Sequence, residues 1–424
     1  MTDPRRRVPR TDAVLAALDA EVAELGHDTV KAAIHTAQQQ VRDGLLAPER
    51  VVDRARAVLR TGPRPVLNAT GVVVHTNLGR APLSAAARAA VQAAAGTTDV
   101  EFDLETGLRR RRGLDTLDAV RAAVPDAQDV HVVNNNAAAL LLCAIVLAGS
   151  RDIVVSRGEL VEIGDGFRIP DLLSSTGARL RGVGTTNRTT VRDYAEAVSG
   201  DTGFVLKVHP SNFQVTGFTS TPSVAELSGL GVPLVVDIGS GLLGPHPVLP
   251  DEPDATSVLR SGASLVTASA DKLLGGPQAG LLLGEAKLVD RLRRHPAARA
   301  VRVDKLTLAA LGATLRGPRP PVVVALEADP SDLLRRAERL AQSLRAQGID
   351  ADAVSSVAVV GGGGAPGVEL PSAAVSLPET YARPLRVGST PVVGRIDHGR
   401  CLLDLRTITE PDDDLLLDAV LSVD

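Results

Sequence analysis

From about residue 125 the sequence alternates between short, almost unbroken apolar runs and longer amphipathic stretches. Strands that are apolar at nearly every residue must be covered on both faces, and the stretches between them suit crossover helices. The pattern predicts an α/β fold with a mostly parallel sheet and helices on both faces. Ala279–Leu283 follows after a short connection and is expected to pair antiparallel. The other expected strands are Val130–Val133, Ile153–Val155, Phe204–Val208, Leu234–Val236 and Leu265–Thr267.

A chain of 424 residues is too long for one compact core, so more than one domain is expected. Residues 1–64 show helical spacing, with one helix starting at Thr11 as its cap, a second around Val30–Val41 and a third from Pro48. We therefore predict a helical N-terminal domain at 1–64, a cofactor-binding core at 65–328 and a small C-terminal α/β domain at 329–424. The last would open with a long helix and hold strands near Val357–Val360, Ala373–Ser376, Val392–Ile396 and Leu402–Leu405.

Composition excludes several classes of protein. No apolar run approaches the roughly 18 residues of a membrane helix, and no apolar stretch follows the N-terminal arginines as in a signal peptide. Cys143 and Cys401 lie far apart in apolar sequence, which predicts reduced core residues and neither a disulfide framework nor a metal site. Together these features predict a cytoplasmic protein with no membrane partner.

Lysine is scarce in this chain, and only lysine can form a Schiff base, because arginine stays protonated. Lys272 follows an expected buried strand and precedes a Gly-Gly-Pro turn, a setting unusual for a surface lysine. Ser269 lies three residues earlier and is placed to bond a phosphate. Ser-x-x-Lys also occurs in penicillin-binding enzymes, but their Lys-Thr-Gly and Ser-Asp-Asn triplets do not occur in this sequence.

Two other motifs stand where expected strands end. In the turn at residues 132–139, Asn135, Asn136 and Ala137 would open a helix whose free amides suit a phosphate, although an Asn-rich turn without a ligand fits equally well. Asp237 ends a buried strand, where its carboxylate would pair with a pyridinium nitrogen; metal binding or turn capping are the alternatives. A phosphate turn, a strand aspartate and then a lysine is the order found in fold-type-I pyridoxal-phosphate enzymes.

The chain resembles the bacterial selenocysteine synthases, the L-seryl-tRNA(Sec) selenium transferases. The resemblance is strong over about residues 66–424 and looser in the N-terminal domain. Its matching segments include Leu67–Ala81, Asn134–Ala139, Val183–Arg188, Lys207–Asn212, Asp271–Gly280, Arg302–Leu308, Pro366–Ser372 and Gly394–Arg400.

This resemblance implies a pyridoxal-phosphate-dependent transferase that converts L-seryl-tRNA(Sec) to L-selenocysteinyl-tRNA(Sec) with selenophosphate, through a cofactor-bound dehydroalanyl-tRNA. The family's cofactor lysine falls on Lys272, which would also carry the Cα proton. Asp271 beside it is a candidate acid, and His209 would stack on or bond the cofactor ring.

Selenophosphate is a small anion that needs fixed cations, and the planar guanidinium group suits phosphate oxygens. Arg80, Arg299 and Arg302 are the expected clamp, although surface arginines are common in this chain. Arg109 and Arg112 match the family's Arg-Gly-x-Arg motif, but Arg110 replaces the glycine. That motif is therefore either a substrate loop or a solvated face.

The N-terminal domain would hold the tRNA. Residues 1–101 contain no aromatic side chain, so arginines would have to recognise the backbone and shape of the RNA. An oligomerisation arm is the alternative reading of this domain. The resemblance implies both roles, in a homo-oligomer that is a decamer built as a pentamer of dimers, with no DNA partner.

Two other functions compete with the transferase. A pyridoxal-phosphate lyase of the same fold, acting on a small amino acid or amino-sugar acid, would share Lys272 and Asp237 but would not need residues 1–64. A catalytically dead tRNA-binding homologue would not need either of these two residues.

Overall fold

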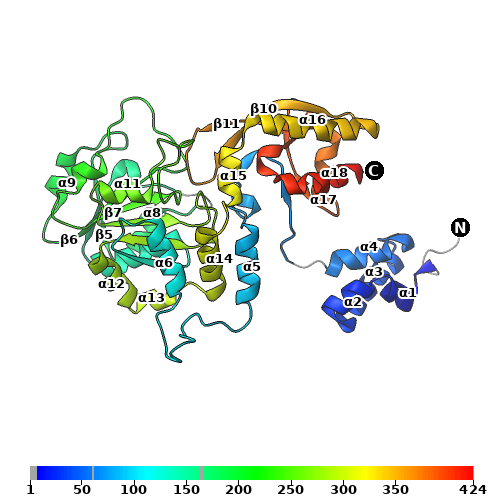
Figure 1. Ribbon diagram of the computed structural model, residues 1–424, viewed down its shortest axis with the longest axis horizontal. Coiled ribbons are helices and arrows are strands. Elements are labelled where there is room, and N and C mark those ends of the chain that lie inside the picture. Colours follow the sequence, from blue (N-terminus) through cyan, green and yellow to red (C-terminus); the bar gives the residue numbers. More distant parts are fainter. Residues whose placement is uncertain (1–6, 60–61, 163, 165, 424) are drawn as a thin grey trace. The chain divides into compact units, whose positions relative to one another are not determined.

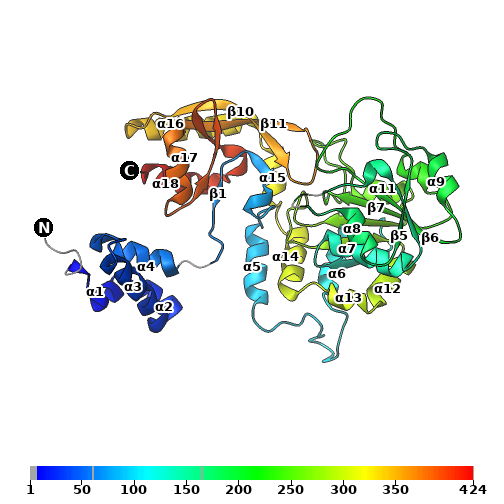
Figure 2. The same ribbon diagram turned by 180° about the vertical axis from the view of Figure 1, so that it is seen from behind.

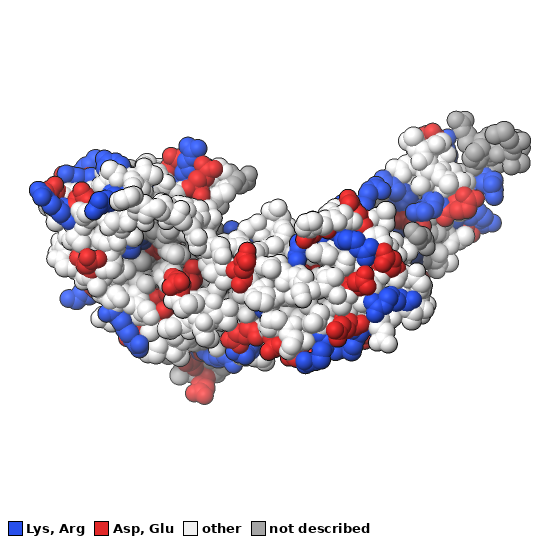
Figure 3. All heavy atoms as spheres, turned by 90° about the horizontal axis from the view of Figure 1, so that it is seen from above, with Lys and Arg blue, Asp and Glu red and all other residues white. Residues whose placement is uncertain are grey.

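The computed structural model describes residues 7–59, 62–162, 164 and 166–423 (Figure 1). The chain forms two compact units, residues 1–65 and residues 66–424. None of the helices in the described residues is long and apolar enough to cross a membrane. Acidic and basic side chains are interspersed over the face shown in Figure 3.

The N-terminal unit is a small bundle of helices (Figure 2). Val14, Leu18, Val30 and Ile34 are among the apolar side chains buried in its core. The expected first helix is broken in two near Leu18, and Thr11 is its first residue and not its cap. The elements are α1 (Thr11–Ala16), α2 (Asp19–Leu25), α3 (His27–Arg42), a 3-10 turn (Pro48–Arg50) and α4 (Val51–Leu59).

The larger unit is built on a seven-stranded sheet in the order β3-β9-β8-β7-β6-β4-β5. Strands β4 to β8 run parallel, whereas β9 is antiparallel to both of its neighbours, which confirms the antiparallel pairing predicted for Ala279–Leu283. The strands are β3 (Asp129–Val133), β4 (Asp152–Ser156), β5 (Arg179–Val183), β6 (Thr202–Val208), β7 (Leu234–Gly239), β8 (Leu265–Ser269) and β9 (Gly280–Gly284).

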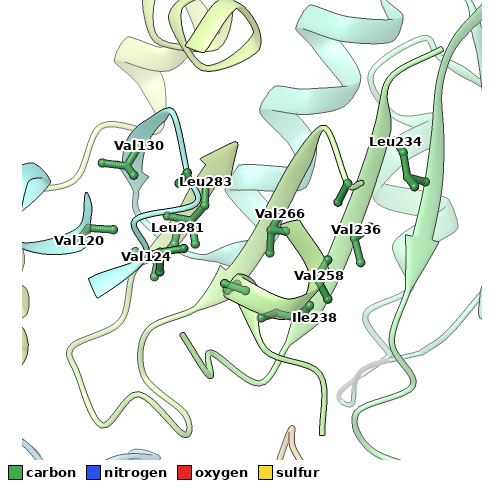
Figure 4. Packing of buried hydrophobic residues seen from close by; sticks show 14 of the residues in the cluster. Val120, Val124, Val130, Leu234, Val236, Ile238, Val258, Val266, Leu281 and Leu283 are labelled. Atoms are coloured by element: carbon green, nitrogen blue, oxygen red, sulfur yellow. The ribbon is translucent and has the colours of Figure 1, made fainter. Parts of the chain in front are cut away.

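Successive residues of these strands enter two different hydrophobic cores, one on each face of the sheet. Leu234 and Val236 belong to one core, shown in Figure 4, whereas Val235 between them belongs to the other, which also holds Cys143. The predicted coverage on both faces is therefore confirmed. The first core receives side chains from α6 (Leu114–Ala123), α9 (Val191–Ala197), α10 (Val224–Leu227), α11 (Ala255–Arg260) and α14 (Lys305–Arg316), and the second from α7 (Asn136–Cys143), α8 (Ile169–Ser174), α12 (Ala286–Arg294) and α13 (Ala297–Ala300).

A second sheet of five strands, in the order β13-β14-β11-β10-β2, uses both ends of the larger unit. β2 (Val72–Val74) pairs parallel with β10 (Asp352–Gly361), and β1 (Leu67–Asn68) pairs with β12 (Val392–Val393). A segment from the start of the unit thus completes the C-terminal sheet. The remaining elements are β11 (Glu369–Pro378), β13 (Arg395–Asp397), β14 (Arg400–Asp404), α5 (Ala85–Ala94), α15 (Pro321–Glu327), α16 (Pro330–Ala346), α17 (Ala382–Val387) and α18 (Asp413–Leu421).

Candidate active site

Asp237 lies near the C-terminal end of β7, with 2% of its surface exposed. Its Oδ1 accepts hydrogen bonds from Asn136 Nδ2 at 2.8 Å, from Thr267 Oγ1 at 3.1 Å and from the Gly239 amide at 3.1 Å. Burial raises the pKa of this carboxyl, although these hydrogen bonds and the Lys272 charge act in the opposite direction. A buried carboxylate of this kind suits a cationic partner, such as a protonated ring nitrogen.

Lys272 lies in the loop between β8 and β9, with 7% of its surface exposed. Within the described part of the chain, no hydrogen-bond acceptor lies within reach of its Nζ atom. Burial lowers the pKa of the Lys272 amine, and the Arg80 charge adds to this, whereas Asp237 and Asp271 act against it. A neutral amine is the form that attacks an aldehyde, so this setting suits a Schiff-base lysine.

A glycine loop at residues 361–364 covers the end of the Lys272 side chain. A Cβ atom at Gly363 would lie 2.6 Å from Lys272 Nζ, and one at Gly364 would lie 2.9 Å from Leu273 Cδ1. Gly363 also has φ +92°, a conformation that favours glycine. This loop was not predicted from the sequence, although four consecutive glycines mark it.

The Asn-rich turn lies at the same end of the sheet. The Asn135 side chain accepts a hydrogen bond from the Ala138 amide at 2.8 Å and so caps α7, while the Asn136 side chain is engaged by Asp237. The first amides of α7, at Asn136 and Ala137, therefore remain as donors. Ser269 pairs with Gly280 at the start of β9, where a Cβ atom would lie 2.1 Å from the Asn135 carbonyl oxygen. This close approach places Ser269 beside the turn.

His209 follows β6 and is held by two different contacts. Its amide donates a hydrogen bond to the Asp237 carbonyl at 2.9 Å. Its Nε2 lies 3.2 Å from Oε2 of Glu252, a buried carboxylate that was not predicted from the sequence. The first contact fixes the His209 backbone next to the strand that carries Asp237.

Arg80 and Asp271 form an ion pair of 2.7 Å between Nη1 and Oδ2. The Ala81 amide also donates to the Asp271 carbonyl at 3.2 Å, and Arg80 itself has φ +66°. The pair borders a pocket of about 490 Å³ that is also lined by Thr76, Gly79, Leu83, Pro277 and Gln278. The ion pair places the Asp271 carboxylate where it orients the Arg80 guanidinium group.

Three of the other predicted arginines converge on the Glu101 carboxylate. Arg109, Arg112 and Arg302 approach it at 3.0, 3.1 and 3.4 Å respectively. The hydrogen bond from Arg112 is the main reason that the pKa of Glu101 is lowered. Three guanidinium groups around one carboxylate leave an excess of positive charge.

Arg299 and Arg110 lie outside this set of three arginines. Arg299, in α13, is exposed, and its side chain has no hydrogen-bond or ion-pair partner among the described residues. Arg110, which replaces the family's glycine, does not have a positive φ and pairs with Asp99 and Asp115 at 3.4 and 2.8 Å. The replacement therefore does not strain the backbone of this loop.

The chain matches known proteins over nearly its whole length. The family model described as L-seryl-tRNA selenium transferase matches residues 66–409, and that of the selenocysteine synthase N-terminal region matches residues 5–42. The L-seryl-tRNA(Sec) selenium transferase of Geobacter sulfurreducens is 41% identical over 98% of this chain and 98% of its own length. The Moorella thermoacetica enzyme of the same name is 44% identical over 86% of this chain and 82% of its own length.

Among solved structures, D-glucosaminate-6-phosphate ammonia-lyase is similar, with a TM-score of 0.60 and 18% identity. The likeness covers 85% of this chain and 96% of that one, and it concerns the fold alone. The predicted α/β fold of type I is confirmed. The sequence matches go further, because they span both units, and the chain belongs to the L-seryl-tRNA selenium transferase family.

Proposed function

We propose that this protein converts L-seryl-tRNA(Sec) to L-selenocysteinyl-tRNA(Sec), with pyridoxal phosphate held by Lys272 and with selenophosphate as the selenium donor. Family membership supports the reaction and the cofactor. The single observation in the structure that carries the proposal is the buried pair of Lys272 and Asp237 at the ends of neighbouring strands. This pair supplies both an amine for the cofactor aldehyde and a carboxylate for its ring nitrogen.

The described residues fit pyridoxal phosphate in several respects. The Lys272 amine is buried without a hydrogen-bond partner from the described residues, and the pKa of Asp237 is raised by burial, as expected for groups that await a partner. The amides at the start of α7 and the Ser269 hydroxyl would hold the phosphate, and His209 would lie on or beside the ring. When bound, the cofactor withdraws electrons from the Cα atom of an attached amino acid.

Lys272 would also move protons at the seryl Cα atom. When the Lys272 amine is not bonded to the cofactor, burial would lower its pKa and favour its neutral form. The neutral amine can then accept the Cα proton and return it after selenium has been added. Loss of the serine hydroxyl leaves the dehydroalanyl group on the tRNA as the acceptor for selenium.

The arginines would hold the selenium donor. Arg80 lines the pocket beside Lys272 and is oriented by Asp271, which supports a place for it near the reacting group. Arg302, Arg109 and Arg112 form the cluster around Glu101, and the Arg299 side chain is exposed and has no partner among the described residues. Planar guanidinium groups bind phosphate oxygens in pairs, so this set suits selenophosphate.

The N-terminal unit would bind the tRNA. Its match to the selenocysteine synthase N-terminal model and its separate helical core support this role. We also propose that the protein works in the cytoplasm as a homo-oligomer, a decamer built from dimers, in line with its family resemblance. The division into domains at 1–64, 65–328 and 329–424 remains part of this proposal.

The decisive experiment incubates the protein with seryl-tRNA(Sec), pyridoxal phosphate and selenophosphate and measures selenocysteinyl-tRNA(Sec). Formation of that product supports the transferase. A lyase would instead release ammonia from a small amino acid or amino-sugar acid and leave the seryl-tRNA unchanged. The match of residues 5–42 to the family's N-terminal model favours the transferase, because a lyase does not need that unit.

A further inference from the structure

Glu252 is a buried carboxylate close to the cofactor site. Its side chain is 2% exposed and lies in the turn between Leu249 and α11. Burial of a charged carboxylate is unfavourable unless other groups compensate for the lost water. The contacts of Glu252 therefore indicate what holds it there.

One carboxylate oxygen makes both of its contacts. Oε2 lies 3.2 Å from His209 Nε2 and accepts a hydrogen bond of 2.7 Å from the Ala365 amide. The other oxygen, Oε1, is buried and has no hydrogen-bond partner in the described residues. Glu252 thus joins His209, which follows β6, to Ala365, which follows β10.

Ala365 is the residue directly after the glycine loop that covers Lys272. It has φ +46°, unusual for alanine, so its amide is held in an orientation that the chain does not readily adopt alone. Two residues earlier, Gly363 packs against the Lys272 amine. The hydrogen bond from Ala365 to Glu252 therefore fixes the loop at the point where it turns away from Lys272.

We infer that Glu252 is a positioning residue of the cofactor site, which holds the His209 ring and, through Ala365, the glycine loop at residues 361–364 together over Lys272. The inference rests on the proposed roles of Lys272 and His209. It goes beyond them because it assigns the closure of the site to a carboxylate outside the sequence motifs.

The carboxylate also contributes charge. The charged groups that face the Lys272 amine are Asp237 from β7, Asp271 from its own loop, Arg80 and Glu252, and the His209 ring lies beside Glu252. Glu252 acts to raise the pKa of the Lys272 amine. In the same way, a negative charge at Glu252 stabilises the protonated Schiff base and raises the pH at which it loses its proton.

The test compares Glu252→Gln and Glu252→Ala in the full-length protein loaded with pyridoxal phosphate. In Glu252→Gln the side-chain oxygen still accepts from the Ala365 amide, so hydrogen exchange over residues 361–368 stays as in the wild type. The absorbance titration of the Schiff base then moves to lower pH by about half a unit to one unit. In Glu252→Ala the loop loses its anchor, exchange becomes at least about tenfold faster and the cofactor is retained less tightly.

Two controls separate the effect of the Glu252 charge from the effects of other groups. Glu327 approaches His246 at 3.4 Å and is not among the groups that shift the pKa of Lys272, so Glu327→Gln should change neither readout. The titration is repeated with His209→Asn introduced into both the wild type and Glu252→Gln, so that these two proteins differ only in the charge of the Glu252 side chain. An unchanged midpoint in Glu252→Gln on that background, or wild-type loop exchange in Glu252→Ala, overturns the inference. Absence of a Schiff base from the wild type overturns the proposed role of Lys272 instead.

Discussion

Arg80 donates a hydrogen bond of 2.7 Å to Asp271, the residue directly before Lys272. The pair is partly exposed, with side-chain exposures of 39% and 10%, so its contribution to stability is modest, about 0–1 kcal/mol. The ion pair matters mainly for orientation, because the Asp271 carboxylate, which lies just after β8, directs the Arg80 guanidinium along the wall of the pocket.

If the two residues act as a unit, their substitutions will not be additive. Arg80→Ala and Asp271→Asn should each slow selenium transfer, and the double variant should be no slower than the slower single variant. The measurement is a double-mutant cycle on the single-turnover rate. A larger loss in Asp271→Asn than in Arg80→Ala, with disappearance of the alkaline limb of the pH profile, where a proton donor loses its proton, would show Asp271 to be the proton donor.

Lys272→Ala should abolish the Schiff-base absorbance at the border of the visible and ultraviolet ranges. The buried Lys272 amine is the nucleophile that this chemistry needs, whereas Lys287 is exposed and serves as the control in Lys287→Ala. Borohydride reduction followed by peptide mapping locates the attached cofactor. Attachment that persists in Lys272→Ala, for example through Lys305, would contradict the assignment.

Gly363→Ala should lower cofactor loading at least about tenfold, because its Cβ atom would lie 2.6 Å from Lys272 Nζ. Gly399→Ala is the matched control, since Gly399 also has a positive φ of +73° but no atom within 4 Å of its Cβ position. Both substitutions cost about 1 kcal/mol in backbone strain, so only crowding distinguishes them. Loading is measured by absorbance after dialysis. Equal loading of the two variants would show that the loop does not press on Lys272.

Arg299→Ala and Arg302→Ala should weaken selenophosphate use by about tenfold to a hundredfold while the cofactor stays bound. Each charge-assisted bond to a phosphate contributes roughly 1.5–3 kcal/mol, and lysine should rescue only in part because it lacks the planar fork. Arg294→Ala, at an exposed arginine of α12 that pairs with Asp290, is the control.

The two half-reactions of these arginine variants are followed in single turnovers. Formation of dehydroalanyl-tRNA should change less than formation of selenocysteinyl-tRNA, because only the second step needs the donor anion. A parallel fall of both steps with loss of cofactor would mean that these arginines support the fold or the cofactor phosphate. If neither step falls, Arg109 and Arg112 become the next residues to replace.

Deletion of residues 1–64 should leave the cofactor bound and remove tRNA binding. The first 65 residues form a compact unit with its own hydrophobic core, so the larger unit keeps its sheets intact. The measurement is filter binding of seryl-tRNA(Sec) at a fixed salt concentration. Unchanged affinity together with a smaller assembly in light scattering would make the unit an oligomerisation arm.

Functional residues at the ends of buried strands could be predicted from the sequence, because local patterns mark them. Asp237 and Lys272 each follow an apolar run, and the structure places both at the same end of the sheet. β5 was missed because its residues alternate between exposed arginines and less exposed residues, so no apolar run marks this edge strand. The break near Leu18 was also missed, since Leu18 keeps the helical spacing while it leaves the helix.

Contacts between distant segments could not be predicted from one sequence. Glu252 stands in a polar, proline-bounded turn that is typical of a solvated surface, and only the fold brings it to His209. Glu101 likewise shows no motif, and its role depends on arginines that come from two separate segments. Residues that carry the chemistry can thus be predicted from local sequence patterns, whereas the residues that orient them are brought into place only by tertiary packing.

The pairing of β2 with β10 has a consequence for synthesis on the ribosome. Val73 and Val74 are buried, yet their partner strand begins only at Asp352. At about 5–20 residues per second, roughly 15 to 60 s pass between the translation of the two strands. During that interval the early strand has no neighbour and must be kept from aggregating, and Lys272 has no cover until Gly363 has also emerged. The nascent chain therefore cannot enclose its cofactor until translation is nearly complete.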